Sequence, residues 1–276
     1  MIHEIHAEAK IGQIIENLEV AKDYFILSVL LRSSQCDAMP GQFAMIRRQN
    51  VKDPLLSRPL GLYGVYETEA GTVLEFFYHV VGRGTSVLSH LVIGDQISIL
   101  VPLGKPFDLQ FEPRSHVVLI AGGIGLAPLT YLADYLFNTA TAIKKLTLYM
   151  GAAEAATLVG MKRIERFCTD IKIATDDGSA GFKGTITALF QKDLPTMDHE
   201  NMVLFACGPY GMVRHLAQVI APYDIPCHIS TEERMACGIG TCLGCAIKIR
   251  TADNSWAYRR VCKDGPVFDI RDIMWD

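Results

Sequence analysis

The chain has 276 residues, of which 50% are hydrophobic and 20% are charged, and its formal net charge is −4. These values are typical of a folded globular protein of about two domains, and they argue against a disordered chain or a basic nucleic-acid-binding protein. The first ten residues are polar, and the long uncharged run Ser115–Ala133 is broken by three glycines and Pro128. We therefore expect neither a secretory signal nor a membrane span.

Residues 1–108 are predicted to form a small antiparallel β-barrel. Runs rich in β-branched and aromatic residues occupy 11–18, 24–31, 43–46, 73–81 and 96–101. Turn signals such as Pro40-Gly41 and Gly94-Asp95 separate these runs, and no long helical pattern interrupts them. Many short strands of this kind are typical of a barrel.

Two motifs in this region suit an anionic cofactor. In Arg58-Pro59-Leu60-Gly61, a guanidinium stands beside a rigid proline, where it can contact a phosphate or a flavin oxygen. In Gly82-Arg83-Gly84-Thr85-Ser86, ahead of a short helical run at 87–91, backbone N–H groups and the threonine hydroxyl can hold a second phosphate. Taken alone, each motif is equally compatible with a hairpin turn.

Residues 109–225 show the alternation expected for a parallel sheet. Strands are predicted at 117–121, 146–150, 171–174 and 202–206. Helices are predicted from leucines at helical spacing between Leu126 and Leu136, and near 161–168, 184–190 and 211–220. Strands that alternate with helices form parallel sheets with right-handed crossovers.

Two turns of this region are candidate dinucleotide contacts. Glycines 122, 123 and 125 lie where the first strand passes into the first helix, and such glycines let N–H groups approach a pyrophosphate. The run differs from G-x-G-x-x-G, so a plain turn is the alternative. Cys207-Gly208-Pro209 follows another strand and should face the same crevice, because ligands bind beyond the carboxyl ends of parallel strands. Cys207 is either a neighbour of a nicotinamide or a small residue that ends a buried strand.

Residues 226–276 carry the most specific pattern. Cys237, Cys242, Cys245 and Cys262 follow C-x4-C-x2-C with a lone fourth cysteine, the plant-type spacing for a [2Fe–2S] cluster. Glycines in the loop let N–H groups approach the sulfurs. A zinc site, usually built from two C-x2-C pairs, is the less favoured alternative. The other four cysteines are scattered, which predicts reduced thiols in a cytoplasmic protein.

The order of these motifs resembles the ferredoxin reductase superfamily. The segments Ser230–Cys245 and Arg260–Phe268 look very like the electron-transfer subunits of bacterial NAD-dependent dihydroorotate dehydrogenases. This resemblance covers essentially the whole chain. It implies an FAD-binding barrel at 1–108, an NAD-binding α/β domain at 109–225 and a small [2Fe–2S] domain at 226–276.

The resemblance also implies a role for each candidate residue. The isoalloxazine and ribityl chain should contact Arg58, Pro59, Leu60 and Gly61, and the FAD phosphates should contact Gly82, Gly84, Thr85 and Ser86. The NAD phosphates should contact Gly122, Gly123 and Gly125, and the nicotinamide should contact Cys207, Gly208 and Pro209. The cluster should be bound by Cys237, Cys242, Cys245 and Cys262. Relatives commonly carry a serine where this chain has Gly61, so the surroundings of flavin N5 differ here.

The implied function is an electron relay in pyrimidine synthesis. NAD(H) exchanges a hydride with FAD, and the cluster exchanges single electrons with an FMN-containing dihydroorotate dehydrogenase catalytic subunit, in a heterotetramer. Hydride transfer needs no protein acid or base, so we expect no catalytic side chain. The same module serving another partner, a sulfhydrogenase or a ferredoxin:NADP⁺ oxidoreductase, is the alternative. A zinc-stabilised regulator that senses NAD(H) is a rival of another class.

Overall fold

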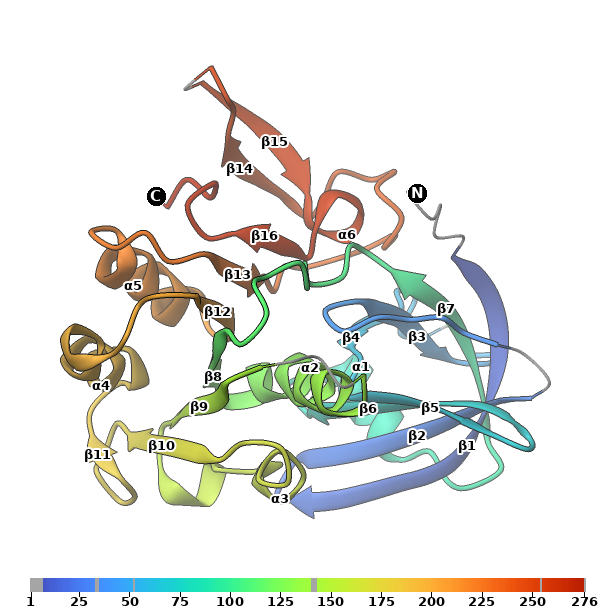
Figure 1. Ribbon diagram of the computed structural model, residues 1–276. Helices are drawn as coiled ribbons and strands as arrows, with labels where there is room; N and C mark the ends of the chain where they lie inside the picture. The colour runs from blue at the N-terminus through green and yellow to red at the C-terminus, as the bar shows by residue number, and fades with distance from the viewer. Residues whose placement is uncertain (1–6, 33–34, 52, 140–142, 254, 276) are drawn as a thin grey trace.

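The computed structural model describes residues 7–32, 35–51, 53–139, 143–253 and 255–275. Its strands form two seven-stranded sheets and one two-stranded hairpin. Figure 1 shows the first sheet beside the second, with the C-terminal hairpin and the last loop above the junction between them. No helix in the described part of the chain is long and apolar enough to cross a membrane.

The first sheet is antiparallel throughout and has the order β4-β3-β7-β1-β2-β6-β5. Its strands are β1 (Glu8–Ala21), β2 (Tyr24–Arg32), β3 (Phe43–Arg48), β4 (Arg58–Gly61), β5 (Gly64–Thr68), β6 (Gly71–His79) and β7 (Gln96–Leu103), and helix α1 (Arg83–Ser89) follows β6.

The two edges of this sheet meet. Only Leu62 and Tyr63 separate the edge strands β4 and β5 in the sequence, so the sheet has to curl. The Leu62 N–H donates to the Gln42 carbonyl at 3.2 Å, and the Tyr63 N–H donates to the Glu75 carbonyl of β6 at 2.8 Å. The predicted antiparallel barrel is confirmed as a curled sheet of this kind. The sequence analysis does not predict β4, because Pro59 argues against a strand. Proline is tolerated here because β4 lies at the edge of the sheet.

The second sheet has the order β11-β10-β9-β8-β12-β13-β16 and is parallel except for its last strand. Its strands are β8 (His116–Gly122), β9 (Lys145–Ala152), β10 (Asp170–Thr175), β11 (Phe182–Lys183), β12 (Met202–Cys207), β13 (Cys227–Ser230) and β16 (Val267–Asp269). Its helices are η1 (Gly123–Gly125), α2 (Leu126–Asn138), η2 (Ala155–Thr157), α3 (Met161–Ile164), α4 (Ile186–Asp193), η3 (Leu194–Thr196) and α5 (Tyr210–Ile220).

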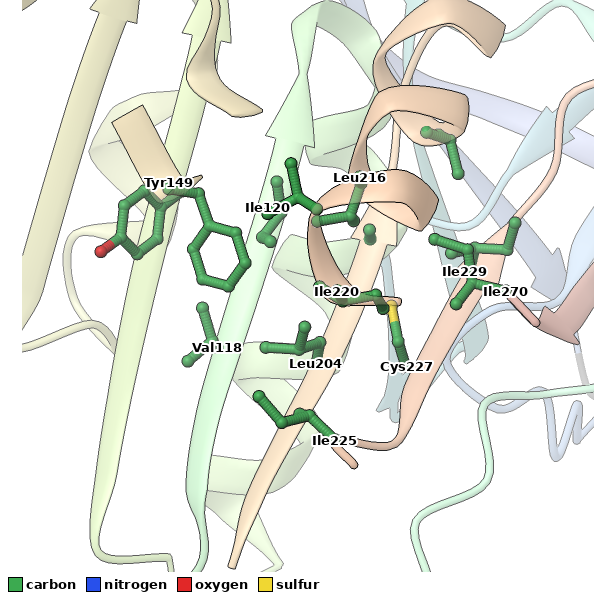
Figure 2. Close-up of a cluster of buried hydrophobic side chains, with 14 of the residues drawn as sticks. Val118, Ile120, Tyr149, Leu204, Leu216, Ile220, Ile225, Cys227, Ile229 and Ile270 are labelled. Carbon is green, nitrogen blue, oxygen red and sulfur yellow. The ribbon is translucent and has the colours of Figure 1, made fainter. Parts of the chain in front are cut away.

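Helices cover both faces of this sheet, as a buried parallel sheet requires. Figure 2 shows one face, where Val118 and Ile120 of β8 and Leu204 of β12 pack against Leu216 and Ile220 of α5. The alternate residues of the same strands point to the other face, against α2 and α3. The carboxyl ends of β8 and β12 are thereby held side by side, in the register Cys207 opposite Ala121.

Helix boundaries differ from the sequence predictions at three places. Helix α3 is only four residues long, ending at Ile164 instead of 168. Helix α4 begins after Thr185, whose hydroxyl accepts the Ala188 N–H at 3.2 Å. Helix α1 begins at Arg83 instead of 87, because the Thr85 hydroxyl already accepts backbone N–H groups of the preceding turn.

The C-terminal segment is shared between two structures. Its hairpin consists of β14 (Ala246–Arg250) and β15 (Trp256–Arg260), followed by α6 (Val261–Asp264). Strands β13 and β16, which also lie within 226–276, extend the second sheet. The segment between β13 and β16, which contains both the cysteine loop and the hairpin, is therefore held at both ends by that sheet. The three domain limits stay a prediction.

Candidate functional site

A cleft of about 340 Å³ lies where the barrel, the second sheet and the segment after β13 meet. The barrel contributes Pro59, Leu60, Gly61 and Thr85 from the two predicted cofactor motifs. The second sheet contributes Ile124 and Cys207 from its two predicted turns. Most of the other lining residues are apolar, among them Phe43, Phe77, Val81, Ala127, Pro128 and Met235. An apolar cleft with a few convergent polar groups is the usual form of a cofactor site.

Arg58 carries an unpaired donor; it directly precedes the cleft residue Pro59 and lines a separate small pocket with Gly84. Its Nε is buried and has no hydrogen-bond partner in the described part of the chain, while its Nη2 donates to the Leu56 carbonyl at 3.0 Å. Gly84 makes room for the guanidinium, since a Cβ there would lie 2.4 Å from Arg58 Cδ. A buried N–H without a partner costs about 1–3 kcal/mol unless a ligand oxygen accepts from it. The motif residues thus fit an anionic or carbonyl-bearing cofactor such as FAD.

The turn before α1 is organised by Thr85. Its hydroxyl accepts the Val81 N–H at 3.0 Å and donates to the Gly82 carbonyl at 3.1 Å. The Thr85 hydroxyl is therefore engaged within the turn, which leaves the backbone N–H groups at the start of α1 as the candidate donors of this motif. Gly82 is open, because nothing lies within 4 Å of a Cβ built there, and Ser86 closes the first helical turn by donating its N–H to the Gly82 carbonyl.

The glycines after β8 divide into two kinds. A Cβ on Gly125 would lie 2.2 Å from the Cys207 carbonyl oxygen, and one on Gly122 would lie 2.8 Å from Pro209 Cδ. Gly208 is equally confined, with a built Cβ 3.0 Å from the Gly122 nitrogen. These three glycines let the two turns pack together. Gly123, at φ +53° with nothing within 4 Å, is the one whose backbone is open to a ligand.

Cys207 is a neutral wall residue of the cleft. It is 2% exposed, and burial raises the pKa of its thiol well above the ordinary value; the nearby Glu232 carboxylate raises it further, against a hydrogen bond with Ser230. A thiol in this state packs beside a ligand and does not act as a nucleophile. Cys207 ends the buried strand β12 and lines the cleft, and its place beside a nicotinamide stays a prediction.

The segment 230–235 was not recognised from the sequence as part of the site. Ser230, Thr231, Glu232, Glu233 and Met235 all line the cleft. Glu232 is accessible from the mouth of the cleft, yet the surrounding walls desolvate its carboxyl and raise its pKa. The segment directly follows the carboxyl end of the parallel strand β13, a four-residue strand that the sequence analysis does not predict.

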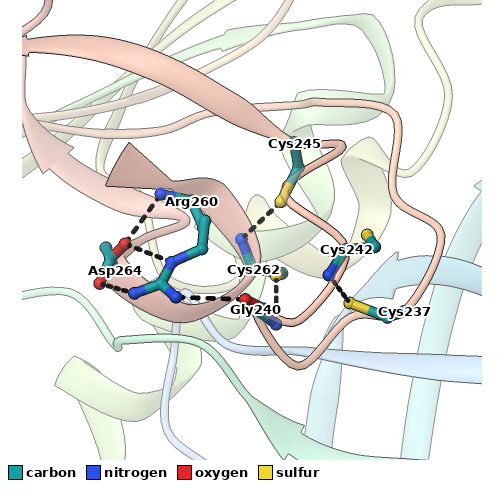
Figure 3. Close-up of polar contacts among 7 residues, drawn as sticks. All are labelled: Cys237, Gly240, Cys242, Cys245, Arg260, Cys262 and Asp264. Atoms are coloured by element: carbon teal, nitrogen blue, oxygen red, sulfur yellow. Dashed lines mark hydrogen bonds and ion pairs between the residues drawn. The ribbon is translucent and has the colours of Figure 1, made fainter. Parts of the chain in front are cut away.

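The four predicted cluster cysteines come together in one loop and its flanking helix (Figure 3). The Cys242 N–H donates to Cys237 Sγ and the Cys262 N–H donates to Cys245 Sγ, both at 3.4 Å, and the Gly240 N–H donates to Cys262 Sγ at 3.1 Å. Left-handed backbone at Gly238 and Gly240, with φ of +72° and +82°, aims the loop N–H groups inward.

The loop chemistry fits iron–sulfur ligation. Burial alone would raise the pKa of Cys237, but N–H groups of the loop, that of Cys242 foremost, outweigh it and lower the pKa to about 6. Cys262 is buried, and its pKa rises to about 12. In the part of the chain that the structure describes, no three His, Cys, Asp or Glu side chains converge on a single metal position. A [2Fe–2S] cluster takes two thiolates at each of two irons, and the loop offers its sulfurs in such pairs.

The cysteine loop packs directly on the wall of the cleft. Cys245 and Cys262 share a buried cluster with Phe43 and Met45 of β3 and Leu103 of β7, and Met235 packs against it. Gly238 lies against the barrel so closely that a Cβ would be 2.4 Å from Met45 Cγ. Since Phe43 and Met235 line the cleft as well, a single layer of side chains separates the two sites.

Comparisons with known proteins agree with this arrangement. Residues 232–274 match the family model "Iron-sulfur cluster binding domain of dihydroorotate dehydrogenase B", and residues 119–218 match "Oxidoreductase NAD-binding domain". The chain is 37% identical over 239 residues to the dihydroorotate dehydrogenase B (NAD(+)) electron transfer subunit of Desulforamulus reducens, covering 87% of this chain and 88% of that one. It is 34% identical over 258 residues to that of Clostridium acetobutylicum, covering 94% of each.

Among solved structures, the chain is similar to the NADH-dependent reduced ferredoxin-NADP oxidoreductase. The TM-score is 0.81 with 27% identity, covering 99% of this chain and 92% of that one. A ferredoxin NADP+ reductase from Neisseria gonorrhoeae with bound FAD and NADP shares the fold, with a TM-score of 0.66 and 16% identity over 79% of this chain and 93% of that one.

Proposed function

This chain belongs to the family of dihydroorotate dehydrogenase B electron transfer subunits, and from that membership we propose that it relays electrons between NAD(H) and a catalytic partner subunit. The observation that carries the proposal is the shared wall formed by Phe43 and Met235. It places a cleft suited to a flavin against a loop suited to a [2Fe–2S] cluster, as a relay without mobile carriers requires.

We assign the groups of the relay to the motifs that the sequence predicts for them. The isoalloxazine and ribityl chain of FAD lie against Arg58, Pro59, Leu60 and Gly61, and the FAD phosphates against Gly82, Gly84, Thr85 and Ser86. The NAD phosphates lie over Gly123, with Gly122 and Gly125 shaping that turn, and the nicotinamide end lies near Cys207, Gly208 and Pro209. The cluster is held by Cys237, Cys242, Cys245 and Cys262.

Bound FAD supplies hydride exchange on one side and single-electron exchange on the other, which couples NAD(H) to the cluster. The chain's own residues position these groups and exclude water. Arg58 offers its buried Nε–H to a flavin oxygen, and the neutral Cys207 keeps the nicotinamide end of the cleft uncharged. Phe77, Ala127 and Pro128 give the cleft dry walls. No side chain is needed as an acid or base for the hydride step.

The partner docks, in this proposal, on the exposed side of the cysteine loop. Cys242 is exposed, and the large side chains beside it in the loop, Ile239 and Leu243, are 51% and 63% exposed. Leu243 also has a left-handed backbone, with φ +59°, a conformation that is unfavourable for a residue other than glycine. We propose that the partner is the FMN-containing dihydroorotate dehydrogenase catalytic subunit, in a heterotetramer in the cytoplasm.

A second candidate rests on the structural similarity to the ferredoxin-NADP oxidoreductase. In that case the same relay serves ferredoxin or a hydrogenase-type partner. Combining the purified chain with an FMN catalytic subunit should give dihydroorotate-dependent reduction of NAD⁺. Reduction of ferredoxin by NADH, without dihydroorotate-dependent activity, would support the second candidate and refute the first.

The relay itself is tested by the visible spectrum of the anaerobically purified chain, before and after NADH. We expect flavin bands together with broad absorption at longer wavelengths, both bleached by NADH. Cys242→Ser should lose the long-wavelength absorption and keep the flavin, because the cleft does not include this residue. Arg58→Leu should lose the flavin bands and keep the long-wavelength absorption of the cluster. A colourless protein that stays colourless after reconstitution with FAD, iron and sulfide would refute the relay.

A further inference from the structure

An ion pair between Arg260 and Asp264 lies beside the cysteine loop (Figure 3). Arg260, the last residue of β15, places its Nε 3.1 Å from Asp264 Oδ2 and its Nη2 3.5 Å from Asp264 Oδ1. The backbone N–H of Arg260 donates to the same carboxylate at 2.8 Å. The two side chains are 31% and 23% exposed, so solvent only partly screens the pair.

The remaining nitrogen of the guanidinium, Nη1, contacts the cysteine loop. Arg260 Nη1 donates to the Gly240 carbonyl at 3.1 Å, and the N–H of the same glycine donates to Cys262 Sγ at 3.1 Å. Gly240 is buried with a left-handed backbone, and a Cβ there would lie 2.8 Å from Lys263 Cδ. Arg260 therefore contacts the residue whose N–H is directed at the sulfur of Cys262.

The pair also brings opposite charges close to the two buried sulfurs. Arg260 and Asp264 lie two residues before and two residues after Cys262, and the Arg260 guanidinium contacts the glycine whose N–H donates to the sulfur of Cys262. The cation and the anion thus lie at one end of the site for the cluster. Hydrogen bonds to sulfur and nearby charge are the main means by which a protein sets the potential of an iron–sulfur cluster.

We propose that Arg260 and Asp264 are positioning residues that set the reduction potential of the cluster bound by the four cysteines; this rests on the proposed function. Reduction adds one negative charge to the cluster. The Arg260 cation and the Gly240 N–H favour the reduced state, and the Asp264 carboxylate opposes it while it holds the guanidinium in place. The two residues therefore act on the potential with opposite signs.

The test is a redox titration of the reconstituted holoprotein, followed by electron paramagnetic resonance for the cluster and by visible absorption for the flavin. R260Q should lower the cluster potential, because it removes the cation and leaves Asp264 unpaired. D264N should raise it, because the cation and its contact with Gly240 remain. We expect each variant to change the reduction equilibrium at least tenfold, which is about 59 mV for a one-electron couple. The reduction potential of the flavin should not change in either variant.

Arg250→Gln is the matched control. It removes an equal charge from the same hairpin, four residues along the strands from the pairing of Ala246 with Arg260, or about 13 Å. We expect it to leave the cluster potential unchanged. R260K keeps the charge but loses the planar guanidinium, so its cluster potential should lie between those of wild type and R260Q. If R260Q does not retain iron, R260K is the variant whose potential is measured instead.

A merely structural pair would loosen the same loop in either variant. Potentials of R260Q and D264N that move in the same direction, or R260K and D264N potentials equal to wild type, would overturn the proposal. A wild-type protein that gives no [2Fe–2S] signal after reconstitution would instead refute the cluster assignment, so the two failures are distinguishable.

Discussion

Arg163 of α3 is the side chain whose removal should most disturb the relation between the barrel and the second sheet. Its Nη1 forms an ion pair with Glu75 of β6, and its Nη2 lies 3.0 Å from Asp134 of α2. The guanidinium also lies 4.6 Å from the ring centre of Tyr63. The three charged side chains are 21%, 14% and 24% exposed. One cation thus pairs with two carboxylates, one from the barrel and one from a helix that packs on the second sheet.

Arg163→Met keeps most of the side-chain volume and removes the charge. Removing one partner of a fully buried ion pair costs about 3–5 kcal/mol. Because these side chains remain about one-fifth exposed, we expect a loss of about 2–3 kcal/mol in the free energy of unfolding. Urea denaturation followed by intrinsic fluorescence measures it, and the rate at which NADH bleaches the flavin should fall in parallel, since the cleft walls are no longer held together.

Arg166→Met is the matched control, because Arg166 is an exposed arginine of the same segment whose described contact is with the ring of Phe167 at 5.8 Å. It should change the stability by less than about 0.5 kcal/mol. A double-mutant cycle of Arg163→Met with Glu75→Gln should give a coupling energy of about 1–3 kcal/mol. An Arg163→Met protein within about 0.5 kcal/mol of wild type would refute the view that this ion pair joins the barrel to the second sheet.

Three further predictions concern single sites. Gly125→Ala should destabilise the chain by about 1–3 kcal/mol in urea denaturation, since its Cβ would meet the Cys207 carbonyl at 2.2 Å; an unchanged midpoint would contradict the packing argument. Gly61→Ser should still bind FAD, because its Cβ would meet only Pro128 at 3.9 Å, and should shift the flavin potential; loss of flavin absorption would show that the space is not free. Burial, and then Lys145, lower the pKa of His116. The unfolded chain therefore binds the extra proton first, and thermal stability should fall as the pH drops below about 6.5, a fall that His116→Gln should reduce.

Much of the site could be predicted from the sequence because its signals are local. The C-x4-C-x2-C spacing, the arginine before Pro59 and the glycines after β8 each reflect a short-range requirement of a ligand or a turn. Their roles were harder to separate. Gly122, Gly123 and Gly125 look alike in the sequence, but only Gly123 is open, because the other two are confined by residues of the turn after β12.

The missed elements have a common physical cause. Strand β4 contains a proline and β16 has three residues, so neither has a pattern of its own. Each is a strand because a neighbour offers it an edge: β3 in one case and β13 in the other. Glu232 was missed for a similar reason, since nothing in its local sequence shows that it enters a cleft formed by three distant segments.

The sequence by itself determined the two fold types and the spacing of the four cysteines, because periodicity, turn chemistry and cysteine spacing act over a few residues. Only the tertiary structure decided which motifs meet. The packing of Cys245 and Cys262 on Phe43 and Met45, the Arg163 ion pairs and the contact of Arg260 with Gly240 join residues brought together by folding. Such contacts depend on how the sheets curl and dock, and short-range patterns do not encode that geometry separately.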